Sequence, residues 1–339
     1  AIAELGRGAG KWLAVTAAVA YGSTVFAGLL AFLVAQSSYP WLLGGTQSID
    51  GLENPEEHAL SGYFEIAMPP VFDVMTALVL AFCLGVGITF VRGTTLHSGF
   101  AELRTIVMRV VEKVIIPLLP LYIFGMFLSL TMNGQIVLVI STFLRVVILA
   151  FIMTVVILLI QYCVAGVVAK RNPFVMLKNM LPAYATALGT SSSAATIPVT
   201  YESTLKNKVE EEVAGFVVPL CATIHLSGSM MKITLYALSI VYMASLDVTG
   251  GQIIGFILLL GIMMIAAPGV PGGAIMAAVG LLQSNLGFDE SMVSLMIASY
   301  IVVDSFGTAA NVTGDGAIAL IVNKFAKGKI KEQQPIDEP

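Results

Sequence analysis

The stretch GTSSSAATIPVTYES, residues 189–203, is the most unusual part of this sequence and the best indication of its fold. It gathers serine and threonine hydroxyls in a chain that is otherwise strongly apolar. A serine run in a solvated loop would be a linker, but this run continues into Ile197, Pro198 and Val199 and lies between two hydrophobic stretches. The sequence therefore holds polar groups inside an apolar region.

The composition identifies that region as a membrane. Of the 339 residues, 57% are hydrophobic and only 11% are charged, an apolar share well above that of a soluble domain. A helix crosses a bilayer in about 20 residues and satisfies its own backbone hydrogen bonds there, whereas the alternating pattern of a β-barrel is absent. We expect an all-α, multi-pass protein of the plasma membrane, the inner membrane of a prokaryote, surrounded by lipid and without a nucleic-acid partner. The clear spans are residues 12–35, 70–91, 107–130, 137–168 and 213–246.

Two further apolar segments, residues 174–200 and 253–286, are each interrupted midway by small and polar residues. Each segment is expected to form two half-length helices that meet at a tip, so the sequence predicts two re-entrant hairpins. Proline and glycine cannot continue a helix without exposing backbone, and such backbone at membrane depth is tolerated only where protein buries it or it lines a cavity. Paired interruptions of this kind indicate the binding site of a transporter. The second tip contains Pro268, Gly269, Pro271, Gly272 and Gly273.

The distribution of charge predicts the orientation. If the chain begins in the cytoplasm and the hairpins enter from opposite sides, the outside loops 36–68, 131–135, 247–252 and 287–290 contain no lysine or arginine. This asymmetry follows the positive-inside rule. The inside segments hold the basic residues Arg7, Lys11, Arg92, Arg104, Lys170, Arg171, Lys206, Lys208, Lys324, Lys327, Lys329 and Lys331.

The last apolar segment, residues 291–324, contains the most informative polar set. Asp304, Thr308, Asn311 and Asp315 follow one another at helical spacing, which places them on one face of a helix. Two carboxylates inside a membrane segment are unfavourable unless they face an ion, an ammonium group or water. Gly307 and Gly314 on the same helix would permit a close backbone approach or local unwinding.

Taken together, these motifs resemble the dicarboxylate/amino acid:cation symporters, a family that includes glutamate and neutral amino acid transporters. GTSSSAATIPVT is similar to the serine-rich first hairpin of that family, GVPGG to its second hairpin tip, and NVTGD to the signature of its last helix. LGRGAGK is similar to the start of its third helix, so the first two helices of the family are expected to be missing from this sequence. The resemblance implies a homotrimer in which a transport domain moves like an elevator against a scaffold.

The same resemblance implies a division of the chain. Residues 1–91 would be scaffold and trimerisation helices, with residues 136–170 also scaffold, and residues 92–135 a peripheral helix of the transport domain. The transport domain would continue with hairpin 1 (171–205), an unwound helix (206–250), hairpin 2 (251–288) and the last helix (289–327). Residues 328–339 would be a cytoplasmic tail.

Residue by residue, the resemblance implies a substrate site on both hairpins and on two helices. Asp304 would hold the α-amino group of an amino acid, and Asp315 would bind sodium together with the carbonyl groups of Cys221, His225 and Asn311. Carboxylate and carbonyl oxygens suit a hard cation. The implied substrate residues are Ser191, Ser192, Ser193, Ser229, Val270, Ala274, Asp304, Gly307, Thr308 and Asn311.

Two departures from the family pattern shape the expected function. HLSGS, residues 225–229, replaces a motif whose carboxylate binds sodium, so sodium coupling would be reduced and His225 becomes a candidate proton carrier, since histidine can titrate near neutral pH. Gly307 stands where the family has a guanidinium group, which predicts a neutral amino acid, with an acidic amino acid or a dicarboxylate as the alternative. No cofactor besides the transported Na⁺ or H⁺ is expected.

Two other classes of protein stay open. An intramembrane serine protease would need a serine, such as Ser191 to Ser193, activated by His225, and a passive channel would not accumulate substrate. Arg145 and Lys232 lie deep in apolar sequence and could be scaffold anchors or lipid contacts, and Lys232 could also take part in coupling.

Overall fold

The structure is a computed structural model, and it describes residues 10–44, 74–90, 93–110, 113–114, 116–132, 136–267 and 272–326. Within these ranges the chain is helical and contains no strand, which confirms the all-α prediction. The helices are α1 (Gly10–Leu42), α2 (Val74–Phe90), α3 (Thr95–Val110), α4 (Ile116–Met132), α5 (Ile136–Ala169), α6 (Pro173–Asn179), α7 (Leu181–Thr190), α8 (Ser193–Lys206), α9 (Glu211–Ile224), α10 (Ser227–Met243), α11 (Gly250–Ala266), α12 (Gly273–Leu286) and α13 (Glu290–Ala326).

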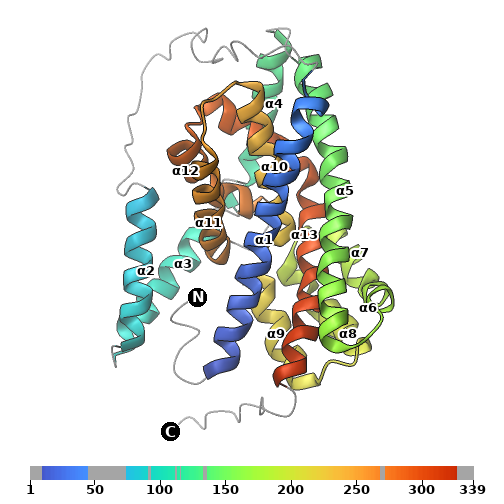
Figure 1. Cartoon of the computed structure of the whole chain (residues 1–339). Coiled ribbons are helices and arrows are strands. Elements are labelled where there is room, and N and C mark those ends of the chain that lie inside the picture. Colours follow the sequence, from blue (N-terminus) through green and yellow to red (C-terminus); the bar gives the residue numbers. More distant parts are fainter. Residues whose placement is uncertain are drawn as a thin grey trace.

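Four segments are long and apolar enough to cross a bilayer: Trp12–Leu42, Val139–Ala169, Glu211–Met243 and Glu290–Ala326. They confirm a multi-pass membrane protein. Figure 1 places the beginning of α1, the junction between α8 and α9 and the end of α13 at one end of the bundle. These are segments that the charge distribution assigns to the cytoplasm, so the arrangement agrees with the predicted orientation.

The expected span at residues 107–130 falls on parts of two helices. α3 ends at Val110 and α4 begins at Ile116, and residues 111, 112 and 115 lie outside the described residues. Pro117 lies in the first turn of α4, where a proline has no N–H bond within the helix to lose.

Both interrupted segments form the pairs of short helices that the sequence predicts. In the first pair, α7 ends at Ser191, whose φ of 50° lies in the left-handed region, and α8 begins after the N-cap Ser192, whose Oγ accepts a hydrogen bond from the Ala195 N–H. In the second pair, α11 and α12 flank a tip that includes residues 268–271, which lie outside the described residues. Gly272, the N-cap of α12, has a φ of 74°, a conformation that glycine adopts without strain.

Helix α13 runs through the middle of the bundle and connects its two apolar cores (Figure 1). It packs against α5, α7, α8, α9 and α10, while α1 packs against α10 and α11. α2 and α3 lie to one side in Figure 1. The division into scaffold and transport domain stays a prediction.

Candidate functional site

The polar face of α13 is buried, as the helical spacing predicts. Asp304, Thr308, Asn311 and Asp315 are 7%, 6%, 3% and 1% exposed. Both glycines on the face remain helical, so the local unwinding considered from the sequence does not occur. Gly314 instead allows His225 to pack closely against α13, because a Cβ atom on this glycine would lie only 2.6 Å from Cε1 of His225.

Asp304 connects α13 to the second hairpin. Its Oδ2 accepts a hydrogen bond of 2.7 Å from the backbone N–H of Gly272, and Thr308 donates its hydroxyl to the Asp304 carbonyl group at 3.3 Å. Ala274, two residues after Gly272, is buried as well, whereas Val270 lies outside the described residues. The carboxylate therefore lies beside Gly272, at the start of α12.

Asn311 joins α13 to the interrupted helix. α9 ends at Ile224 and α10 begins at Ser227, so His225 and Leu226 break the segment. The N-terminus of a helix leaves N–H groups without partners inside the helix. Asn311 accepts two of them on Oδ1, from Gly228 at 2.8 Å and Ser229 at 3.2 Å, and its Nδ2 donates to Ser229 Oγ at 3.0 Å. A side chain from α13 thus caps α10.

His225 and Asp315 form a buried pair below that cap. His225 Nδ1 lies 2.8 Å from Asp315 Oδ1, and His225 Nε2 lies 3.1 Å from Ser23 Oγ on α1. Gln161 on α5 donates from Nε2 to both Ser23 Oγ and Ser227 Oγ at 3.0 Å. We call these five residues, Ser23, Gln161, Ser227, His225 and Asp315, the histidine cluster. It draws side chains from four helices.

Two of the four groups expected to bind sodium have protein partners here. The Cys221 carbonyl oxygen accepts the His225 N–H at 2.9 Å, and one oxygen of Asp315 faces His225. A sodium ion at Asp315 would have to compete with the imidazole.

Lys232 is a site residue whose position the sequence did not reveal. It lies on α10, is 1% exposed, and donates from Nζ to the Val303 carbonyl oxygen at 3.0 Å. Its Nζ also lies 5.5 Å from the centre of the Phe306 ring, a distance at which a cation attracts the ring face. A Cβ atom on Gly307 would lie 3.7 Å from this ammonium group. Arg145, by contrast, is exposed and donates to the Leu42 carbonyl oxygen.

The three serines of the first hairpin form its tip. Ser191 is the left-handed C-cap of α7, Ser192 caps α8, and Ser193 is the first residue of α8 and is buried. Thr196 donates its hydroxyl to the Ser192 carbonyl oxygen at 2.8 Å. Both hairpin helices pack against α13. The hairpin that carries this tip therefore packs against the helix that bears the polar face.

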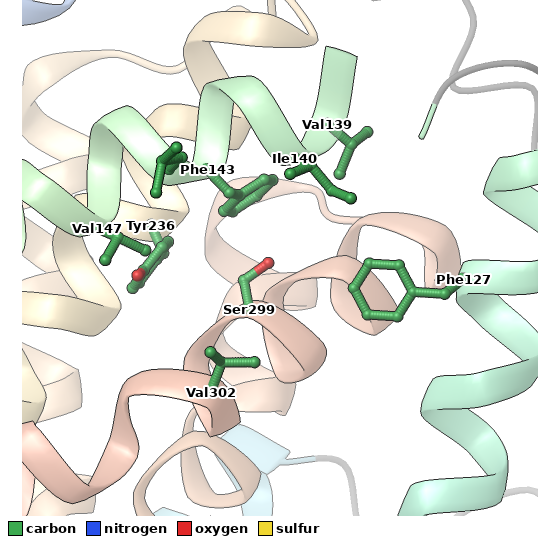
Figure 2. Close-up of a pocket in the computed structure, with 9 residues that line it drawn as sticks. Phe127, Val139, Ile140, Phe143, Val147, Tyr236, Ser299 and Val302 are labelled. Atoms are coloured by element: carbon green, nitrogen blue, oxygen red, sulfur yellow. The ribbon is translucent and has the colours of Figure 1, made fainter. Parts of the chain in front are cut away.

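A cavity of about 190 Å³ lies close to this polar face but is chemically different from it (Figure 2). Ser299 and Val302 of α13 line it together with residues of α4, α5 and α10. Its walls are almost entirely apolar, and Ser299 and Tyr236 supply the hydroxyl groups among its lining residues. This cavity suits a hydrocarbon surface, not a zwitterion.

The sequence matches a family that unites these features. A model of the sodium:dicarboxylate symporter family matches residues 1–325. The chain belongs to this family. It is 30% identical to excitatory amino acid transporter 1 of Rattus norvegicus over 271 residues, which are 77% of this chain and 49% of that protein. It is 34% identical to excitatory amino acid transporter 3 of Oryctolagus cuniculus over 173 residues, 51% of this chain and 33% of that protein. The chain thus spans about half the length of the first of these curated relatives and a third of the second.

One arrangement in this member of the sodium:dicarboxylate symporter family resembles an enzyme site. Ser23, His225 and Asp315 are connected in the order of a serine hydrolase triad. The serine is not one of the hairpin serines that the protease alternative required. Ser23 lies inside the continuous helix α1, where backbone N–H groups are bonded within the helix and leave none for an oxyanion hole.

Proposed function

We propose that this protein is a secondary active transporter that carries an amino acid together with a cation, as a homotrimer with an elevator movement. The observation that carries the proposal is the buried carboxylate Asp304, bonded to the N–H of Gly272 at the tip of hairpin 2. Membership of the symporter family supports it. So does the similarity to relatives that are named amino acid transporters.

Asp304 is the proposed partner of the substrate α-amino group. Its Oδ2 has a backbone donor, and in the structure as described no lysine or arginine lies within ion-pair distance of it. A buried carboxylate gains most when a cation reaches it. The first turn of α8, with Ser192 and Ser193, supplies N–H groups for the α-carboxylate of the same molecule, since the N-terminus of a helix attracts anions.

The substrate side chain is less constrained. The sequence predicted a neutral amino acid because Gly307 provides no cation for a second carboxylate. That argument depends on the surroundings of Gly307, and Lys232 is one of its neighbours. The proposed substrate at this level is therefore an amino acid, neutral or acidic.

The cation is proposed to be a proton carried by the histidine cluster. With neutral His225, Nδ1–H donates to Asp315 and the Ser23 hydroxyl donates to Nε2; with charged His225, both nitrogens donate. The hydrogen-bond partners of both ring nitrogens thus suit either form of the imidazole. Sodium at Asp315 with carbonyls of Cys221, His225 and Asn311 is the second candidate, supported by the name of the family.

Uptake of radiolabelled amino acids into proteoliposomes tests both parts of the proposal. Sodium and pH gradients are imposed separately, and accumulation above the outside concentration is measured. We expect accumulation driven by an inward proton gradient in sodium-free buffer. Accumulation that requires sodium and ignores the pH gradient would select the second candidate. Equilibration without accumulation under either gradient would indicate a channel and contradict the proposed function.

A further inference from the structure

We propose that Lys232 is the specificity-determining residue of the substrate site, and that its ammonium group binds an anionic side chain of the substrate. The proposal rests on the proposed function, because it assumes an amino acid held by Asp304. It goes further by assigning a residue of α10 to the recognition of the side chain.

The charge of Lys232 is incompletely compensated inside the protein. An ammonium group has three N–H donors, and among the described residues Val303 supplies the only acceptor within hydrogen-bond distance, a backbone oxygen. No carboxylate of the described chain lies within ion-pair distance of Nζ, and the Asp304 carboxylate attracts it only from farther away. The Phe306 ring adds a modest attraction. A buried charge left this way is unfavourable, and an arriving anion would compensate it.

The place of the ammonium group matches the place of the proposed substrate. Val303, its acceptor, directly precedes Asp304, so the two charges lie at the same turn of α13. A Cβ atom on Gly307 would lie 3.4 Å from Ser229 Oγ and 3.7 Å from Lys232 Nζ. The glycine therefore leaves a space about the size of a methyl group, bordered by a hydroxyl and an ammonium group, one turn from Asp304.

Together with the first turn of α8, which we propose for the α-carboxylate, this arrangement complements the three charges of an acidic amino acid. Asp304 would bind the ammonium group of the ligand, and Lys232 would bind its side-chain carboxylate through a charge-assisted hydrogen bond. A dicarboxylate without an amine would place a negative charge against Asp304. A neutral amino acid whose α-carboxylate binds α8 would leave Lys232 without an anion. The observations therefore favour aspartate or glutamate over both.

A structural anchor is the competing role, and it makes different predictions. If Lys232 served only to hold the Val303 carbonyl oxygen, Lys232→Met would lower the melting temperature and weaken all substrates alike. If Lys232 instead binds the substrate, the methionine of Lys232→Met replaces an incompletely compensated charge by an apolar side chain of similar length. The melting temperature without substrate would then stay the same or rise.

The experiment measures binding of L-aspartate, L-glutamate, L-serine and succinate to the full chain in detergent, together with the melting temperature. The variants are Lys232→Met, Lys232→Arg and Lys206→Met, the last being an exposed lysine at the end of α8. We expect the unaltered protein to prefer the acidic amino acids about tenfold or more, and Lys232→Met to remove that preference while L-serine binding persists. Lys232→Arg should retain the preference, and Lys206→Met should behave as the unaltered protein.

Two results would overturn the inference while leaving the proposed function in place. One is a preference for L-serine in the unaltered protein, and the other is an unchanged acidic preference in Lys232→Met. Failure of the proposed function has a different signature, since the unaltered protein would then bind none of the three amino acids. Tight binding of succinate in preference to aspartate would remove Asp304 as an ammonium site and overturn both.

Discussion

The two buried carboxylates of α13 differ in how completely the protein compensates them. Asp315 faces a histidine at 2.8 Å, and that histidine is supported in turn by Ser23 and Gln161. Asp304 accepts one backbone N–H and Lys232 donates to one backbone carbonyl oxygen, and among the described residues the two side chains attract each other without a direct ion pair. A charge that a protein pairs directly can stay buried permanently, whereas opposite charges without direct partners favour a ligand that supplies them. The comparison suggests substrate binding at Asp304 and cation coupling at Asp315.

The strongest test of this comparison removes the charge of Asp304. In Asp304→Asn, Oδ1 can still accept the Gly272 N–H, so we expect the protein to fold. Loss of a buried charged partner should weaken amino acid binding by about 2–5 kcal/mol, roughly 30-fold or more in Kd. Isothermal titration with the preferred amino acid measures this. Glu202→Gln, an exposed position on α8, is the matched control, and unchanged affinity in Asp304→Asn would show that the substrate has no ammonium group at this site.

The second test disturbs the histidine cluster without removing any of its polar groups. In Gly314→Ala, the new Cβ would lie 2.6 Å from His225 Cε1 and 2.8 Å from Gln161 Oε1. Overpacking of this kind typically costs about 1–3 kcal/mol. We expect a lower melting temperature in detergent and a loss of gradient-driven uptake. Gly255→Ala on α11 meets nothing within 4 Å and is the control. A Gly314→Ala protein with the stability of that control would mean that α10 and α13 are not packed this closely.

The third test separates coupling from transport. Glutamine in place of His225 can donate to Asp315 but cannot carry a proton, so His225→Gln should leave amino acid exchange intact. It should abolish the acceleration by an inward pH gradient, whose driving force is about 1.4 kcal/mol per pH unit and proton. Exchange and gradient-driven uptake are compared in the same proteoliposomes. Sodium-driven uptake that survives the substitution would assign coupling to Asp315 and sodium.

Local patterns in the sequence predicted the parts of the site that lie on single elements. Helical spacing placed Asp304 and Asp315 on one buried face, and the serine cluster predicted the tip at Ser191 and Ser192. Periodicity describes one helix at a time and contains no information on which residues of two helices meet. The position of Lys232 beside Gly307, and of Ser23 beside His225, depends on the rotation and height of α10, α1 and α13 relative to one another. A lone lysine in apolar sequence was the available signal, and it left open a scaffold anchor, a lipid contact or a part in coupling.

The smallest expected effect comes from the second glycine of α13. In Gly307→Ala, the new Cβ would lie 3.4 Å from Ser229 Oγ and 3.6 Å from Lys232 Cδ, which are ordinary contact distances. The methyl group fits, and alanine favours the helix by about 1 kcal/mol over glycine, so we expect an unchanged or slightly higher melting temperature. The methyl group also fills the space that we assign to the substrate, between Ser229 and Lys232. Affinity for L-aspartate should therefore fall, by an amount smaller than in Asp304→Asn, while Gly255→Ala leaves it unchanged. If Gly307→Ala bound aspartate as tightly as the unaltered protein, the side chain of the substrate would have to lie elsewhere. Lys232 would then not belong to the substrate site, and the contrast between Asp304 with Lys232 and the directly paired Asp315 and His225 would no longer separate substrate binding from coupling.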